Sequence, residues 1–132
     1  MMSMNRSIPP GVIIPELPYD DVNAAAEWLC QAFGFKQRLR IGNHRCQLSF
    51  GEGSVIAIER KEPGMSSVLV HVDNVDTHFE RVKQLGARII NPPTDYPFGE
   101  RQYTVEDIGG HRWTFSQTIA DVDPATWGGI LA

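Results

Sequence analysis

The feature that most constrains the fold is a helix pattern that occurs twice, 53 residues apart. Residues 20–34 begin with Asp-Asp-Val and end on glycine, and residues 73–86 begin with Asp-Asn-Val and also end on glycine. In each copy a capping side chain precedes apolar residues at helical spacing, and the glycine is suited to a helix end. The repeat therefore predicts two helices and an internal duplication of the chain.

Each predicted helix follows one β-like segment and precedes three more, so both halves read strand, helix, strand, strand, strand. The predicted strands are residues 12–18, 36–41, 45–50 and 54–59 in the first half, and 67–72, 87–90, 101–107 and 112–117 in the second. A loop rich in proline and aromatic residues is expected over 91–100, and Gly109-Gly110 is expected in a hairpin turn. Residues 118–132 are predicted to form a tail with one helical turn that begins at Asp123, with Trp127 as a packing residue.

Composition limits the function classes. A chain of 132 residues is expected to form a single domain, residues 1–132, with module one over about 12–60 and module two over about 67–117. A net charge of -4 gives no reason to expect nucleic acid or an anionic membrane as partner. No apolar run resembles a signal peptide or a membrane span, which predicts a cytoplasmic protein. Cys30 and Cys46 lack metal or redox spacing and are expected to be buried free thiols.

Strand residues alternate between two faces, and the helices should cover the more apolar face. In the first strand this assigns Ile13, Pro15 and Leu17 to the covered face. The second face then receives Ile14 and Glu16 from the first strand, Ser67, Leu69 and His71 from the fifth, and Thr114 from the last. Such a mixed face fits either a ligand groove or ordinary solvated strands, and composition alone leaves both open.

Three stretches carry a resemblance to a known family. They are DDVNAAAEWLCQAFGF at 20–35, HVDNVDTHFERVKQLGA at 71–87 and GERQYTVEDIGGHRWTFS at 99–116. Within the strand-helix-strand-strand-strand repeat they resemble the vicinal-oxygen-chelate superfamily of glyoxalases, bleomycin-resistance proteins and dioxygenases, and most of all its small PhnB-like members. The resemblance implies an α+β fold in which two βαβββ modules form a curled sheet around a groove, commonly completed in a homodimer.

The resemblance also locates the family's metal ligands, which come from the first, fifth and last strands. In this chain the corresponding positions are Ile14, Ser67 and Thr114. Isoleucine has no donor atom, and neutral hydroxyls bind divalent ions far less well than imidazole or carboxylate. We therefore expect no metal and no cofactor at these positions.

Three functional hypotheses follow. The first is a metal-independent, bleomycin-resistance-like protein that sequesters an aromatic or cationic small molecule, with groove candidates Ile14, Glu16, Ser67, Leu69, His71, Arg101 and Thr114. The second is a metal-dependent lyase or dioxygenase with Glu16, His71 or Glu59 as displaced ligands. The third is an accessory domain that binds a protein through its open sheet face.

The predicted elements also suggest roles for a carboxylate, two aromatic rings and a histidine. Glu16 lies beside the apolar Ile14, where its carboxylate would suit the binding of a cation or the role of a general base. The alternative is an exposed glutamate in a salt bridge. The rings of Tyr96 and Phe98 suit stacking on a flat ligand, or else packing within their own loop. His78 is predicted to lie on the solvent side of the second helix.

Overall fold

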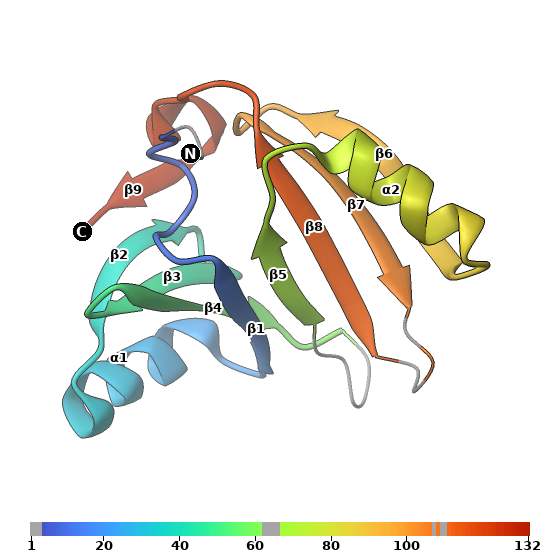
Figure 1. The fold of residues 1–132 in the computed structure, drawn as a ribbon. Coiled ribbons are helices and arrows are strands. Elements are labelled where there is room, and N and C mark those ends of the chain that lie inside the picture. Colours follow the sequence, from blue (N-terminus) through green and yellow to red (C-terminus); the bar gives the residue numbers. More distant parts are fainter. Residues whose placement is uncertain (1–3, 62–66, 107, 109–110) are drawn as a thin grey trace.

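The protein forms one nine-stranded sheet that curls around its own inner face, with a helix on the outside of each half (Figure 1). The computed structural model describes residues 4–61, 67–106, 108 and 111–132. The elements in chain order are β1 Ile13–Tyr19, α1 Val22–Phe33, β2 Lys36–Ile41, β3 Arg45–Phe50, β4 Gly53–Glu59, β5 Ser67–His71, α2 Val75–Gln84, β6 Arg88–Tyr96, β7 Glu100–Glu106, β8 Arg112–Thr118, the 3-10 helix η1 Pro124–Trp127, and β9 Gly129–Leu131.

The strand order is β6-β7-β8-β5-β1-β4-β3-β2-β9. Within the modules β1 runs parallel to β4 and β5 runs parallel to β8, and the antiparallel pair β1·β5 joins the two modules. The predicted α+β fold of two βαβββ modules is thus confirmed. Because the two modules meet along β1 and β5, the inner face of the sheet receives side chains from both.

The two helices begin where their capping residues predict. Asp21 accepts a hydrogen bond from the backbone N–H of Ala24, and Asn74 accepts one from that of Thr77. Gly34 ends α1 with a φ of 80°, a left-handed conformation that glycine adopts at little cost. The capping pattern read from the repeat is therefore correct. Over the described part of the chain, neither helix is long and apolar enough to cross a bilayer.

Each helix packs its apolar stripe on the outer face of its own module. Under α1 lies a cluster that includes Val22, Leu29 and Leu48, and under α2 lies one built around Val75 and Tyr103. A third cluster, of Ile8, Ile14, Ile56 and Leu69, lies apart from the helices. Ile8 precedes the first strand, so a segment at the start of the described chain supplies part of this third cluster.

Two strands differ from the sequence prediction. Strand β6 continues to Tyr96 instead of ending at residue 90, so the expected loop over 91–100 shrinks to a short turn after Tyr96. Pro92 and Pro93 are tolerated because β6 is an edge strand with register shifts at this point. The short strand β9, which pairs with β2, was not predicted. The Gly109-Gly110 turn lies outside the described residues.

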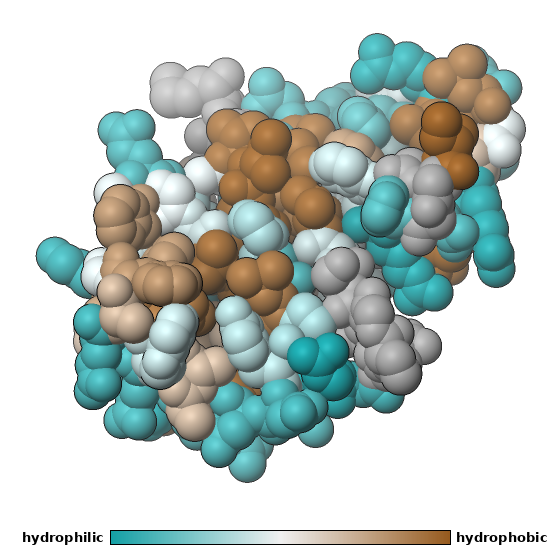
Figure 2. Space-filling view, turned by 90° about the horizontal axis from the view of Figure 1, so that it is seen from below, coloured by the Kyte–Doolittle hydropathy of each residue, from teal (hydrophilic) through white to brown (hydrophobic). Residues whose placement is uncertain are grey.

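The outer face between the helices is less covered than predicted. Ile13 was expected under a helix but is 60% exposed, because β1 lies in the middle of the sheet, between the parts that α1 and α2 cover. Figure 2 shows hydrophobic residues gathered near the middle of the molecule in the view from below. The homodimer implied by the family stays a prediction.

Candidate functional site

A cavity of about 400 Å³ lies on the inner face of the sheet and draws its lining from both modules. This volume falls within the range of small-molecule sites. The strands and the turns between them contribute ten lining residues, and the segments before β1 and after β8 contribute three. The first group is Glu16, His44, Arg45, Gln47, Leu69, Tyr96, Phe98, Gln102, Thr104 and Thr114, and the second is Ser7, Ile8 and Trp127.

A buried carboxylate forms part of this lining. Glu16 on β1 is 9% exposed and faces Ser67 across the β1·β5 pair. The Ser67 hydroxyl donates to Glu16 Oε1 at 2.5 Å, and Arg45 Nη2 on β3 donates to Glu16 Oε2 at 3.2 Å. Both carboxylate oxygens are therefore engaged, and the negative charge has a cationic partner.

Strands β7 and β8 give the cavity a polar, uncharged part of its wall. The hydroxyl oxygens of Thr104 on β7 and Thr114 on β8 lie 3.0 Å apart and share a hydrogen bond. Gln102 Nε2 donates to Ser116 Oγ at 3.0 Å. These groups can exchange hydrogen bonds with a ligand without a change in charge.

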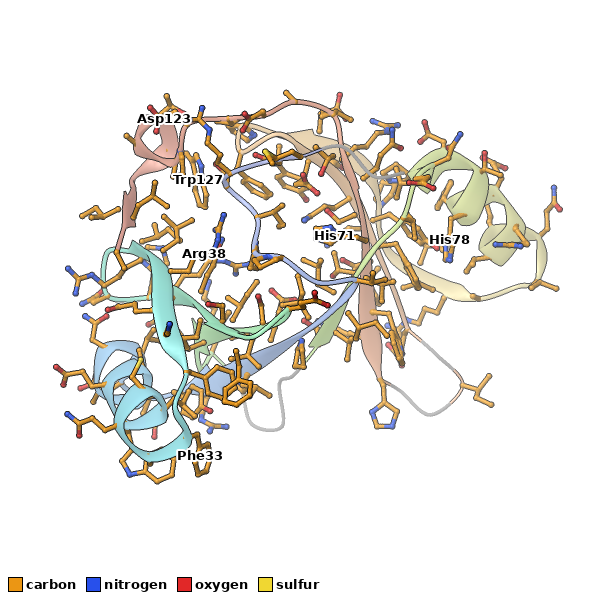
Figure 3. The ribbon with its side chains drawn as sticks, turned by 60° about the vertical axis from the view of Figure 1, so that its left-hand side comes forward. Phe33, Arg38, His71, His78, Asp123 and Trp127 are labelled. Carbon is orange, nitrogen blue, oxygen red and sulfur yellow. The ribbon has the colours of Figure 1, made fainter. Side chains whose placement is uncertain are left out.

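Three aromatic rings line another part of the cavity. Tyr96 and Phe98 stack with ring centroids 5.4 Å apart and planes inclined by 13°. Trp127 from η1 packs against Phe98 at 5.3 Å, and Figure 3 shows its side chain extending from η1 toward the space between the two halves of the sheet. Together the rings offer flat apolar surface suited to stacking on a planar ligand.

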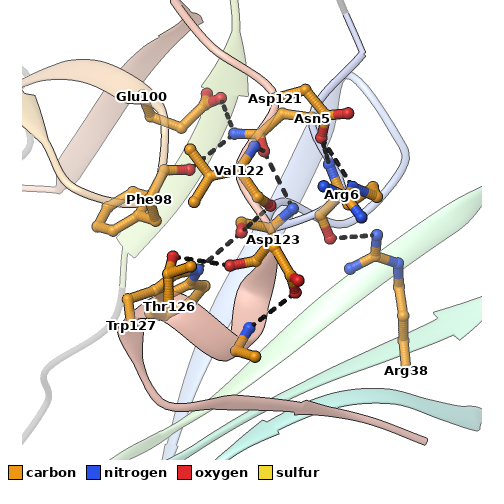
Figure 4. A network of polar contacts seen from close by, with 12 residues as sticks. Asn5, Arg6, Arg38, Phe98, Glu100, Asp121, Val122, Asp123, Thr126 and Trp127 are labelled. Atoms are coloured by element: carbon orange, nitrogen blue, oxygen red, sulfur yellow. Dashed lines mark hydrogen bonds and ion pairs between the residues drawn. The ribbon is translucent and has the colours of Figure 1, made fainter.

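Two terminal segments add to the cavity lining: the N-terminal strap, residues 4–12, contributes Ser7 and Ile8, and the C-terminal arm, residues 119–132, contributes Trp127. Figures 1 and 4 show that the strap and the arm lie side by side. Asn5 of the strap donates through Nδ2 to the Phe98 carbonyl and to Glu100 Oε2, each at 2.8 Å. Its Oδ1 accepts from the backbone N–H of Ser7 at 3.1 Å and of Val122 at 3.2 Å. One buried amide thus ties the strap to the arm and to the β6–β7 turn.

Ser7 makes the second connection between strap, arm and sheet. Its hydroxyl donates to the Val122 carbonyl at 2.8 Å and accepts from Trp127 Nε1 at 2.7 Å. Its carbonyl accepts from Gln47 Nε2 at 2.8 Å. On the outside, Arg6 pairs with Asp121 at 3.1 Å. The orientation of the Trp127 ring in the cavity therefore depends on the strap.

The seven residues predicted for the groove divide into three groups. Glu16, Leu69 and Thr114 line the cavity. Ser67 bonds to Glu16, and Ile14 lies fully buried in the cluster that contains Leu69. His71 and Arg101 do not line it, each for a different reason.

Arg101 lies on the opposite face of β7. Its guanidinium pairs with Asp76 of α2 and with Asp95 of β6, both at 2.9 Å. Its neighbours Glu100 and Gln102 occupy the inner face, so alternation along the strand turns Arg101 outward. The expectation of a groove position for Arg101 is therefore corrected.

The family's metal positions do not fit a divalent ion. Ile14 has no donor atom, the Ser67 hydroxyl is bonded to Glu16, and the Thr114 hydroxyl is bonded to Thr104. The residues of the displaced-ligand hypothesis also do not converge. Over the described residues, no group of three His, Cys, Asp or Glu side chains could hold a metal ion, and Glu16 is already committed to Ser67 and Arg45.

His71 lies near the opposite end of β5 from Ser67, with its Nε2 buried and without a hydrogen-bond partner. Burial lowers the pKa of His71, and the nearby Glu100 carboxylate partly offsets this shift. His78 was predicted on the solvent side of α2, but it is half-buried, with Nδ1 2.5 Å from the Tyr103 hydroxyl oxygen. Burial, followed by the charge of Arg81, lowers the pKa of His78.

These two histidines should make the protein acid-sensitive. Their folded-state pKa values lie below the ordinary value of 6.5, so the unfolded chain takes up protons first as the pH falls. The free energy of unfolding should therefore be flat above about pH 7.5 and fall as the pH drops through about 6.5 toward the lowered values. Urea titrations at several pH values test this. The double variant His71→Gln/His78→Gln should lose part of the slope; a slope equal to that of the wild type would refute the assignment.

Several lining residues were not predicted. Arg45 follows a hairpin turn and looks in sequence like a solvated strand end, and Trp127 lies in the tail. The alternation rule identifies Arg45 only once the register of β3 against β4 is known. Tyr96 and Phe98 were singled out as stacking residues, and both line the cavity.

Solved structures of other proteins are similar to this chain. TioX from Micromonospora sp. ML1 is 36% identical, over 82% of this chain and 98% of that one, with a TM-score of 0.39. The methylmalonyl-CoA epimerase of Streptomyces coelicolor, solved as a single-residue variant in complex with 2-nitronate-propionyl-CoA, is 14% identical over 89% of this chain and 100% of that one, with a TM-score of 0.69. The second similarity concerns the fold alone.

Among curated proteins, the uncharacterized protein Mb0911c of Mycobacterium bovis is 32% identical over 62 residues. The matched stretch is 46% of this chain and 41% of that protein, so the chain spans less than half the length of this relative. Residues 12–115 match the family model described as Glyoxalase/Bleomycin resistance protein/Dioxygenase superfamily. With most of its length matched, the chain belongs to the glyoxalase/bleomycin resistance protein/dioxygenase superfamily.

Proposed function

We propose that the protein is a small, PhnB-like binding protein that sequesters an aromatic molecule in the cavity between its two modules, without a metal ion. One observation carries the proposal. Three aromatic rings line a cavity that also has polar groups, and the positions that hold the metal in the family offer no free metal ligand in this chain. Stacking on Tyr96, Phe98 and Trp127 supplies affinity, and the hydroxyls of Thr104 and Thr114 supply orientation.

The contribution of the strap and the arm to the cavity lining supports sequestration of a ligand. Ser7 and Ile8 of the strap and Trp127 of the arm belong to the cavity lining, although they lie outside the family-matched residues 12–115. A ligand enclosed by these segments is withdrawn from solvent, which favours slow release. The name of the epimerase relative gives no reason to transfer its reaction, because that similarity concerns the fold.

Thermal unfolding of chelator-treated protein tests the proposal. A two-ring aromatic compound such as 2-naphthol, added at about one hundred times its Kd, should stabilise the fold by about 2.7 kcal/mol, which is a rise of several degrees in Tm. Nickel, zinc, cobalt, manganese and iron(II) should each give no comparable rise.

Two variants locate the binding. Thr114→Phe places a ring in the cavity and should abolish the 2-naphthol shift. Phe33→Ala removes an exposed ring at the end of α1, remote from Trp127, and should retain the shift (Figure 3). Stabilisation that requires a divalent ion, or that persists in Thr114→Phe, would contradict the proposed function.

A further inference from the structure

We propose that Arg45 selects the ligand by binding an oxygen acceptor on it, a carboxylate or a carbonyl, while the aromatic part of the ligand stacks on the rings. This assignment rests on the proposed function and narrows its ligand class. It starts from the charged side chains in the cavity lining, which are Glu16 and Arg45; the lining also includes the imidazole of His44.

Glu16 is not available to a cationic ligand. Its carboxylate is buried, with one oxygen accepting from the Ser67 hydroxyl and the other from Arg45 Nη2. The Arg45 guanidinium already neutralises the charge of Glu16, and a ligand ammonium placed at this carboxylate would be repelled by the guanidinium beside it. The cavity therefore does not favour the cationic ligand considered from the sequence.

Arg45 has donors to spare. A guanidinium carries five N–H groups, and within the described residues that of Arg45 donates from Nη2 to Glu16. The Arg45 side chain is 31% exposed and lines the cavity. Its remaining N–H groups can therefore donate to a ligand oxygen, and the fixed fork of the guanidinium suits the two oxygens of a carboxylate.

The buried pair also positions the guanidinium. Glu16 holds Arg45 from one side, and Ser67 in turn holds Glu16. An arginine held in this way loses little conformational freedom when it binds a ligand. Glu16 also reduces the positive potential that a ligand anion meets, so removal of its charge should strengthen anion binding.

Three naphthalene compounds that differ in one substituent test the assignment: 2-naphthoate, 2-naphthamide and 2-naphthylmethylammonium. Titration of the wild type at pH 8, followed by calorimetry, should give the tightest binding for the carboxylate and the weakest for the ammonium. The expected difference between these two is about tenfold or more.

Two substitutions separate the role of Arg45 from that of Glu16. Arg45→Gln should remove the preference for the carboxylate, with a loss of about tenfold for 2-naphthoate and little change for the ammonium compound. Glu16→Gln should instead raise the affinity for 2-naphthoate by several-fold. Arg60→Gln, which removes an exposed arginine paired with Asp20, should leave all three affinities unchanged.

The outcomes distinguish this assignment from the proposed function. Equal affinities for the three compounds, or a preference for the ammonium, would overturn the role of Arg45 and leave aromatic binding intact. An equal loss for all three compounds in Arg45→Gln would reduce Arg45 to a structural residue. Failure of all three to bind the wild type at millimolar concentration would overturn both proposals.

Discussion

Replacement of Glu100 by alanine should lower the free energy of unfolding by about 3 kcal/mol. Glu100 is fully buried, and its carboxylate accepts from Ser116 Oγ and Thr118 Oγ1, each at 2.7 Å, and from Asn5 Nδ2 at 2.8 Å. Alanine removes the acceptor from all three donors at once and leaves a cavity in its place. A buried donor without an acceptor costs about 1–3 kcal/mol, and the strap loses one of its attachments.

The matched control is Glu106→Ala in the same strand. Glu106 makes a 3.6 Å ion pair with the exposed Arg88, and such surface pairs contribute less than about 1 kcal/mol. Urea unfolding of the two variants measures the difference. Glu100→Gln, which keeps the shape but replaces one acceptor oxygen with a donor group, should fall between wild type and Glu100→Ala. Equal losses for the two alanine variants would contradict the anchoring role of Glu100.

Gly99→Ala should cost about 3 kcal/mol, for two physical reasons. Gly99 has a φ of +89°, which disfavours any residue with a Cβ. An added Cβ would also overlap the Ala120 carbonyl and lie 2.9 Å from Asn5 Nδ2 and from Val122 Cγ2. Since the Gly99 carbonyl accepts the Ile119 N–H at 2.9 Å, the arm could not move away without the loss of this bond.

Gly51→Ala measures the backbone part of this effect alone, so the difference between the two variants gives the steric part. Gly51 has a φ of +59°, but a Cβ there would meet nothing within 4 Å, so the expected loss is about 1 kcal/mol. Thermal or urea unfolding of both variants gives the comparison. If Gly99→Ala were no worse than Gly51→Ala, the close packing of the turn against the strap and the arm would be wrong.

Local signals in the sequence predict much of the framework. The caps at Asp21 and Asn74 and the glycine at 34 are short-range features, so both helices could be predicted from the repeat alone. The β6 boundary was missed because two prolines usually indicate a loop, and only the edge position of β6 makes them acceptable in a strand. Strand β9 was missed because a three-residue strand carries no detectable periodicity.

The candidate site was predicted less completely, because its composition depends on contacts between distant parts of the chain. Alternation placed Glu16, Leu69 and Thr114 on the inner face, but it could not show that Arg45 would neutralise Glu16. The position of His78 depends on how α2 packs on the sheet. Ser7 and Trp127 meet only because both termini return to the same opening.

Metal-independent binding of an aromatic molecule in the cavity is tested most directly by titrating chelator-treated protein with 2-naphthoate. The indole signals of a ¹H–¹⁵N spectrum are followed during the titration. Of the three tryptophans in the chain, Trp127 lines the cavity, whereas Trp28 lies exposed on α1 and serves as an internal reference. Binding in this cavity should give a saturable shift of the signal of Trp127 Nε1–H, the group that donates to Ser7 Oγ, and should leave the Trp28 signal unchanged. A shift of Trp28 instead, or a shift of Trp127 that appears only after a divalent ion is added, would contradict metal-independent binding in this cavity.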